Sequence, residues 1–234
     1  MTVQTGFLDR TIHVGGSDRR YVVYVPRNLD TPSPVVLFLH GIGERGSDGL
    51  IQTQGGLAKA IRSNPASWPA VVVFPQTLEE EVWQGRAADT AMGALDQTMQ
   101  EYDIDASRVY LTGLSMGGNG SWHLAYHHPD RFAAIAVVCG FVSDRPRVPA
   151  FLPDSRDPFS EVSERIKETP TWVFHGDQDE AIPVDESRRM VTALKQAGAD
   201  VRYTEFPGVG HGAWDPAYEM SELAEWMFRQ RRSR

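Results

Sequence analysis

Short apolar runs recur along the chain and alternate with segments whose apolar residues have a helical spacing. The run at residues 35–39 is continuously apolar, which is typical of a strand that is covered on both faces. Similar runs predict further strands at residues 70–74, 109–112, 133–138, 171–174 and 201–206. The segments between them predict helices at residues 50–62, 87–102, 116–127, 185–197 and 216–229. Strands that alternate with helices indicate an α/β fold, with a mostly parallel central sheet and helices on both faces.

The N-terminal segment has a different pattern. Residues 7–14 and 19–25 alternate between apolar and polar side chains, and they flank Gly15-Gly16-Ser17-Asp18. Turn residues between two alternating segments predict an antiparallel hairpin at one side of the sheet. A chain of 234 residues is the right length for one domain with a single large core, so we expect one domain over residues 1–234.

One long stretch has no periodic pattern. Residues 141–160 contain four prolines, which disfavour regular structure. The stretch follows the predicted strand at 133–138, and ligands of parallel sheets bind beside the carboxyl ends of the strands. We therefore interpret residues 141–160 as a small lid or as a wall of the substrate pocket, with Phe141, Phe151 and Phe159 as apolar members.

Charge and hydropathy exclude several classes of protein. The 31 acidic side chains outnumber the 23 basic ones, and the net charge of -8 would repel a phosphate backbone, so we expect no nucleic-acid partner. The N-terminus lacks the basic start and apolar run of a secretory signal, and no apolar stretch is long enough to span a membrane. We expect a cytoplasmic protein that binds no membrane. The single cysteine, Cys139, ends an apolar run and is expected in the core.

The sharpest chemical signal is Gly113-Leu114-Ser115-Met116-Gly117, which follows a predicted strand and precedes a predicted helix. It matches the G-x-S-x-G motif in the context that this motif requires. Small residues at 113 and 117 permit a strained turn that projects the serine hydroxyl from the sheet edge. Ser115 is therefore predicted to be a nucleophile.

A serine hydroxyl needs a base, and the base needs an orienting acid. For this motif the chain order is serine, acid, histidine, which favours His211, in a glycine-rich loop just after the last predicted strand, among seven histidines. The acid should follow the preceding strand, where Asp177, Asp179 and Glu180 compete. We prefer Asp179, because a turn that begins at His175-Gly176 returns the fourth residue to the sheet edge. Asp177 is the alternative, although a role as a turn residue suits it better.

Attack on a carbonyl produces an oxyanion, which needs preorganised hydrogen-bond donors. One expected donor is the backbone amide of Met116, which follows the nucleophile. The second is the amide of Ile42, in the glycine-containing loop after the strand at 35–39. His40 is interpreted as a scaffold residue of that loop. Trp83, Gly41 and Trp214 are expected to contact the substrate, and we predict neither a metal site nor a cofactor.

With these residues identified, the chain resembles the phospholipase/carboxylesterase branch of the α/β-hydrolases, and most closely the dienelactone-hydrolase-like group often named predicted peptidases. The resemblance covers nearly the whole chain and rests on six segments, which are residues 39–46, Phe74-Pro75-Gln76 with Trp83, residues 108–118, Pro129-Asp130-Arg131-Phe132, residues 175–179 and Gly210-His211. It implies an α/β-hydrolase fold, and an aspartate at the place of Asp179 as the triad acid. Dienelactone hydrolases have a cysteine where this chain has Ser115, so that particular reaction is not implied.

Three functions are compatible with these residues. Hydrolysis of a small-molecule carboxylic ester through an acyl-enzyme is the main hypothesis, and the resemblance implies it more strongly than amide cleavage. A serine peptidase or amidase would use the same three residues. A non-catalytic binding protein on the same scaffold is the third, although such a protein would be free to lose a member of the triad. The sequence does not indicate an oligomeric state.

Overall fold

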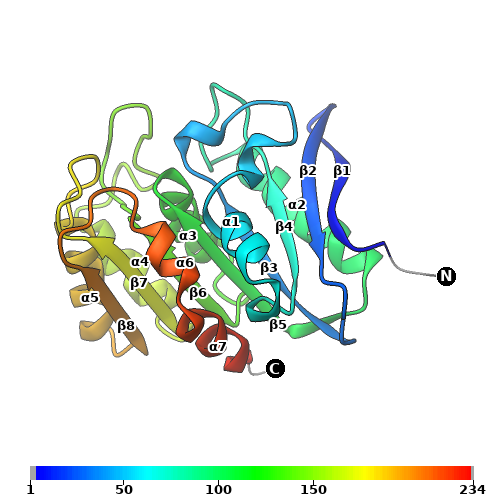
Figure 1. Ribbon diagram of the computed structural model, residues 1–234. Coiled ribbons are helices and arrows are strands. Elements are labelled where there is room, and N and C mark those ends of the chain that lie inside the picture. Colours follow the sequence, from blue (N-terminus) through cyan, green and yellow to red (C-terminus); the bar gives the residue numbers. More distant parts are fainter. Residues whose placement is uncertain (1–3, 233–234) are drawn as a thin grey trace.

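The computed structural model describes residues 4–232, which form one sheet with helices on both faces (Figure 1). Its eight strands lie in the order β1-β2-β4-β3-β5-β6-β7-β8. Their bounds are β1 Gly6–Val14, β2 Ser17–Val25, β3 Ser33–Leu39, β4 Val71–Pro75, β5 Ile104–Leu114, β6 Ala134–Val138, β7 Thr171–Gly176 and β8 Val201–Phe206. The pairs β1/β2 and β2/β4 are antiparallel and all other pairs are parallel, so the predicted α/β class and the N-terminal hairpin are confirmed.

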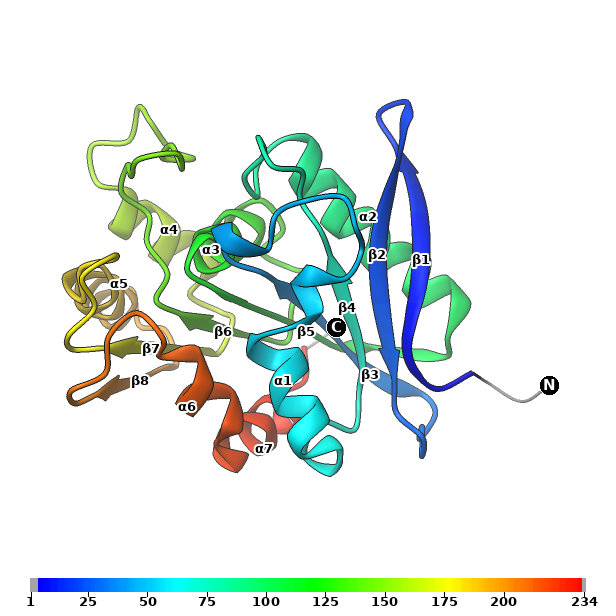
Figure 2. The same cartoon turned by 45° about the horizontal axis from the view of Figure 1, so that its top comes forward.

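The helices divide between the two faces of the sheet because successive side chains of a strand point to opposite sides. On β3, Val35, Leu37 and Leu39 belong to one apolar cluster and Val36 and Phe38 to the other. The first face carries α2 Arg86–Glu101, α3 Met116–His127, α4 Pro158–Ile166 and α5 Asp185–Gln196. The second face carries α1 Gly56–Ser63, α6 Trp214–Glu219 and α7 Ser221–Arg229, which lie in front of the sheet in Figure 1 and below it in Figure 2. Short 3-10 turns complete the chain at η1 Ile42–Glu44, η2 Ile51–Thr53 and η3 Pro65–Ser67.

The structure corrects three expectations about helices. The stretch at 141–160 was expected to be irregular throughout, yet α4 begins inside it at Pro158, where the Asp157 side chain accepts a hydrogen bond from the amide of Ser160. The helix expected at 50–62 begins only at Gly56, after a 3-10 turn. The helix expected at 216–229 is two helices, because the backbone of Met220 is extended (ψ 126°).

The parallel strands end along the same edge of the sheet. Leu39 pairs with Gly113, Leu114 with Val138, Val138 with Phe174, and Gly176 with Phe206. The chain passes from β3 to β4 on one side and then crosses to β5 on the other side of β3, so the direction of winding changes there. Ligands of open α/β sheets bind outside the strand ends at such a switch point. Within residues 4–232, no helix combines the length and apolar character that crossing a membrane requires.

Candidate active site

Ser115 lies at the sharp turn between β5 and α3. Its backbone has a left-handed conformation (φ 53°, ψ -116°), which is strained for a residue other than glycine and is often found at functional sites. The glycines two residues before and after it have no room for a side chain. A Cβ atom built on Gly113 would lie 2.3 Å from the backbone oxygen of Gly117, and one built on Gly117 would lie 1.9 Å from the backbone oxygen of Leu39. The two glycines therefore permit the close packing of strand and helix that places the serine hydroxyl at the sheet edge, where Ser115 is 8% exposed.

The structure brings Ser115, His211 and Asp179 together from three different loops. Ser115 follows β5, Asp179 follows β7, and His211 follows β8. The Ser115 Oγ lies 2.9 Å from His211 Nε2, and His211 Nδ1 lies 2.7 Å from Asp179 Oδ2. A hydrogen on Nδ1 and a lone pair on Nε2 satisfy both contacts, so the imidazole is held in the tautomer that can accept the serine proton.

Asp179 is the acid with the required surroundings. Its side chain has no exposed surface, and its Oδ1 accepts hydrogen bonds from the amides of Ala181 (2.9 Å) and Ile182 (2.8 Å). Burial alone would raise the pKa of Asp179, but hydrogen bonds from His175, His211 and the Ile182 amide outweigh it, so the pKa lies below its usual value. Asp179 is therefore a carboxylate at neutral pH.

His175 is a second histidine on the same carboxylate. Its Nε2 lies 3.2 Å from Asp179 Oδ2 and 2.9 Å from the oxygen of Ile182. Both neighbours are acceptors, so Nε2 carries the hydrogen, and Nδ1 accepts from the hydroxyl of Ser187 at 2.7 Å. His175 thus fixes the turn that carries Asp179. No role was predicted for His175 from the sequence, although its position at the end of a predicted strand was evident.

The two competing acids lie elsewhere. Asp177 Oδ1 accepts a hydrogen bond from the amide of Gly208 at 2.7 Å, so this side chain joins the loop after β7 to the loop that carries His211. Glu180 is exposed. Neither carboxylate has a hydrogen bond to the His211 ring among the described residues.

In the loop after β3, the first three backbone carbonyl groups each accept a hydrogen bond from a side chain. The oxygen of His40 accepts from Trp83 Nε1 (2.9 Å), that of Gly41 from His40 Nδ1 (2.6 Å), and that of Ile42 from Arg45 Nε (3.1 Å). In a trans peptide the C=O and the following N–H point in opposite directions. The bond to the Gly41 oxygen therefore turns the amide of Ile42 away from the His40 ring. A Cβ atom built on Gly41 would lie 3.7 Å from Ser115 Cβ, so this loop borders the nucleophile.

His40 maintains this arrangement as a neutral group. Its Nε2 accepts from the amide of Thr77 at 3.1 Å, so the hydrogen is on Nδ1. Burial lowers the pKa of His40 to about 4, more than the hydrogen bond to Gly41 raises it. The other expected oxyanion donor, the amide of Met116, belongs to the first residue of α3, where amides have no partner within the helix.

The residues expected to contact the substrate differ in burial and in position. Trp83 has no exposed surface and binds the His40 oxygen, so it braces the loop after β3 and offers the substrate no contact in this conformation. Trp214 is half-buried and lies edge-on to His211, with ring centroids 5.2 Å apart. Phe141 and Phe159 are 2% and 4% exposed and belong to the core, which corrects their place in a pocket wall. Phe151 packs on the His123 ring of α3, at 5.3 Å between centroids.

Two further residues beside the triad were not assigned a role from the sequence. Cys139 is buried, as expected, but its thiol donates to the oxygen of His211 at 3.4 Å, and burial raises its pKa. Cys139, His175 and Asp179 offer ligand atoms within 4.8 Å of one another, yet both ring nitrogens of His175 already have partners. Glu44 has a buried carboxyl oxygen without a hydrogen-bond partner in the described structure, 3.0 Å from a Cβ built on Gly41. Only the folded chain brings these groups to the site.

Comparison with known proteins identifies the family. The family model Esterase, described as "Putative esterase", matches residues 13–218. The chain belongs to this esterase family. A solved structure named "Crystal Structure of a Thermostable Esterase" is 33% identical, covers 97% of this chain and 63% of its own, and superposes with a TM-score of 0.81. The carboxylesterase SOBER1 of Arabidopsis thaliana is 24% identical over 83% of this chain and 90% of its own length.

Relatives of this chain also include longer proteins. An "Uncharacterized secreted protein" of Arthroderma benhamiae is 27% identical over 84% of this chain, which spans only 23% of that protein. The solved neighbours include esterases and a "Putative Dienelactone Hydrolase" from Klebsiella pneumoniae (20% identical over 95% of each chain, TM-score 0.62), so the fold is that of the α/β-hydrolases. Because one relative is named as secreted, the cytoplasmic location expected from the sequence stays a prediction.

Proposed function

We propose that this esterase hydrolyses carboxylic esters through an acyl-enzyme, with Ser115 as nucleophile, His211 as general base and Asp179 as the orienting acid. The observation that supports this most directly is the continuous hydrogen-bond chain from the Ser115 hydroxyl to His211 Nε2 (2.9 Å) and from His211 Nδ1 to Asp179 (2.7 Å). A serine, a neutral imidazole and a buried carboxylate in this order are the parts that acyl transfer to a hydroxyl requires.

The reaction has two halves. In the first, Ser115 Oγ attacks the ester carbonyl carbon while His211 Nε2 takes the hydroxyl proton, and the tetrahedral intermediate then expels the alcohol, which receives that proton. In the second, His211 Nε2 accepts a proton from water while the water oxygen attacks the acyl carbon. The bond from that carbon to Ser115 Oγ then breaks, Oγ takes the proton back from His211, and the carboxylic acid leaves. The amides of Ile42 and Met116 donate to the oxyanion in both halves. Every step uses groups of this chain, so the proposal needs no metal or cofactor.

The substrate class follows from the family and from the site. The matching family is one of esterases and the relative SOBER1 is named a carboxylesterase, which supports a small-molecule ester. We propose that Gly41 and Trp214 border the bound ester, since one lies against Ser115 Cβ and the other against the His211 ring. The part of residues 141–160 that precedes α4 remains our proposal for a further wall of the pocket.

The test is a panel of p-nitrophenyl esters and aminoacyl anilides, run on the purified protein and on Ser115→Ala. We expect the esters to be cleaved faster than the anilides, and a serine-directed phosphonate to abolish turnover. Ser115→Ala should lose on the order of 10³-fold or more with its circular dichroism unchanged. If the variant keeps more than a tenth of the activity, Ser115 is not the nucleophile. If the anilides are preferred, the protein is an amidase with the same triad.

A further inference from the structure

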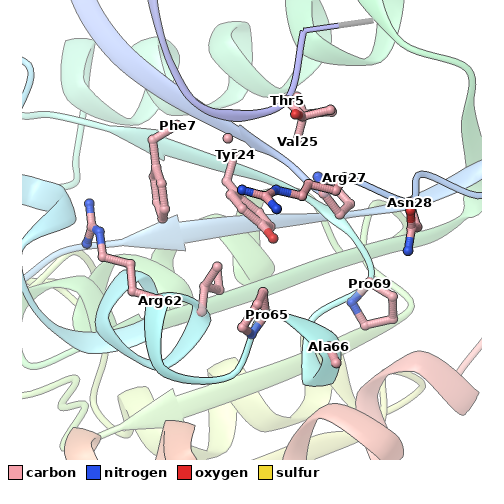
Figure 3. A pocket seen from close by; sticks show the side chains of 13 residues that line it. Thr5, Phe7, Tyr24, Val25, Arg27, Asn28, Arg62, Pro65, Ala66 and Pro69 are labelled. Carbon is pink, nitrogen blue, oxygen red and sulfur yellow. The ribbon is translucent and has the colours of Figure 1, made fainter.

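A cavity lies far from Ser115, between the N-terminal hairpin and α1 (Figure 3). It has a volume of about 670 Å³. Its walls come from the start of β1, the end of β2, the end of α1 and η3. Since β2 runs antiparallel to β4, with Tyr24 opposite Val72 at the start of β4, this cavity is at the sheet edge opposite to the strand ends that carry the triad. Its size lies within the range of small-molecule sites.

The lining of this cavity differs in charge from the rest of the chain. The protein has a net charge of -8, yet the residues that line the cavity include two arginines, Arg27 and Arg62, and no carboxylate. Arg62 is held in place, because its guanidinium donates to Thr53 and lies 4.2 Å from the Phe7 ring centroid. Within the described residues Arg27 forms no ion pair, so its donors are available. A local cluster of positive charge in an acidic protein favours an anionic ligand.

The other lining residues include Thr5 and Asn28, but most of them are apolar. The rings of Phe7 and Tyr24 lie 5.0 Å apart at an angle of 44°, and Pro65 and Pro69 face them across the cavity in Figure 3. Figure 3 also shows the Arg27 guanidinium beside the Tyr24 ring. Burial raises the pKa of Tyr24, so its hydroxyl remains protonated and can donate. An aromatic ring between such surfaces sheds water on both faces.

We propose that this cavity binds an aromatic carboxylate, with the carboxylate on Arg27 and the ring between Tyr24 and the two prolines. The planar guanidinium presents two parallel donors, which match the two oxygens of a carboxylate. The walls that exclude water select an aromatic body over a short aliphatic one. Because the cavity and Ser115 are at opposite edges of the sheet, the ligand does not compete with an ester for the active site. The proposal stands on the cavity alone and does not depend on the reaction at Ser115.

The experiment is isothermal titration calorimetry, with 2-naphthoate titrated into protein whose Ser115 has been blocked with the phosphonate. If the phosphonate does not react, Ser115→Ala takes the place of the blocked protein. We expect saturable binding, about tenfold weaker binding of the neutral 2-naphthamide, and weaker binding of acetate. Arg27→Gln should weaken naphthoate binding by about tenfold and leave the amide unaffected. Arg229→Gln is the matched control, because it removes the same charge from an exposed position on α7 outside the cavity.

Three results would overturn the proposal. They are the absence of saturable binding at millimolar naphthoate, equal affinity for naphthoate and naphthamide, and equal losses in Arg27→Gln and Arg229→Gln. A fourth measurement separates the cavity from the active site. If naphthoate inhibits ester hydrolysis competitively and its binding disappears when the serine is blocked, the ligand occupies the active site and the cavity assignment is wrong.

Discussion

Replacing Asp179 by asparagine tests the proposed triad most sharply, because the two side chains have the same shape. The Asp179 Oδ1 accepts from two backbone amides, so the amide oxygen of the asparagine keeps that position. Its NH₂ group then takes the place of Oδ2, where it meets His211 Nδ1 at 2.7 Å and His175 Nε2 at 3.2 Å. Both of those nitrogens carry hydrogen in the native protein, so the NH₂ group of the asparagine meets two other donors and no acceptor.

The response of His211 sets the size of the effect. The ring relieves the conflict by moving its hydrogen from Nδ1 to Nε2, and Nε2 can then no longer accept the proton of Ser115. Loss of the productive tautomer costs on the order of 10⁴-fold in kcat, or about 5 kcal/mol of transition-state stabilisation. The buried conflict with His175 adds a loss of about 1–3 kcal/mol in the free energy of unfolding. Asp177→Asn is the matched control, because the asparagine oxygen can still accept from Gly208.

The assay is steady-state hydrolysis of p-nitrophenyl acetate by both variants, together with urea unfolding followed by circular dichroism. We expect Asp179→Asn to lose kcat at a nearly constant KM, and Asp177→Asn to stay within about tenfold of the native rate, since it leaves the His211 contacts intact. If Asp179→Asn stays within tenfold of the native rate, the tautomer argument is refuted. If Asp177→Asn loses as much as Asp179→Asn, the assignment of the acid is refuted too.

Three further predictions concern the scaffold around the site. Trp83→Phe removes the donor to the buried His40 oxygen, so urea unfolding should show a loss of about 1–3 kcal/mol and kinetics should show a fall in kcat at unchanged KM; a rise in KM alone would indicate a substrate contact instead. The pKa of His40 is lowered to about 4, so between pH ~6.5 and 4 the unfolded chain binds a proton that the native protein does not. The contribution of neutral His40 to the free energy of unfolding should therefore be fully present above pH ~6.5. Between pH ~6.5 and 4 the free energy of unfolding should fall by roughly 1.4 kcal/mol per pH unit, and a flat profile would contradict this. Gly117→Ala places a Cβ 1.9 Å from the Leu39 oxygen and should cost more than about 4 kcal/mol, whereas Gly43→Ala, whose Cβ meets nothing within 4 Å, should unfold at nearly the native temperature.

The sequence was most informative where a single physical requirement dominates a segment. Continuous apolar runs predicted the central strands, because a strand covered on both faces has no polar positions. The α4 helix was missed because the prolines before it obscured a start signal that was present: Asp157 as the cap, Pro158 in the first turn, and apolar residues at 159, 162 and 166. The start of β5 was missed too, since residues 104–108 are mostly polar and only Ile104 among them pairs with β3, ahead of an irregularity in the register.

The same division applies to the site. The motif around Ser115 and the chain order of acid and histidine selected three residues that the structure brings within hydrogen-bond distance. The role of Trp83 could not be predicted, because an aromatic residue near a strand end suits a pocket and a core equally well. The positions of His175 and Cys139 beside Asp179 also require the folded sheet, since 40 residues separate Cys139 from Asp179 in the chain.

The alignment of strand ends has a consequence for how activity is acquired. The groups proposed to react follow the ends of four strands, β3, β5, β7 and β8. Only lateral pairing across the sheet holds these strands in register. Only a fragment that spans residues 42–211 contains all of them, and parallel pairing between distant segments forms late and slowly. Ester turnover during refolding therefore reports the completion of the sheet, whereas circular dichroism also detects helices that form earlier. Cleavage within residues 141–157 would leave two inactive halves, and any activity recovered on mixing them would measure their reassembly.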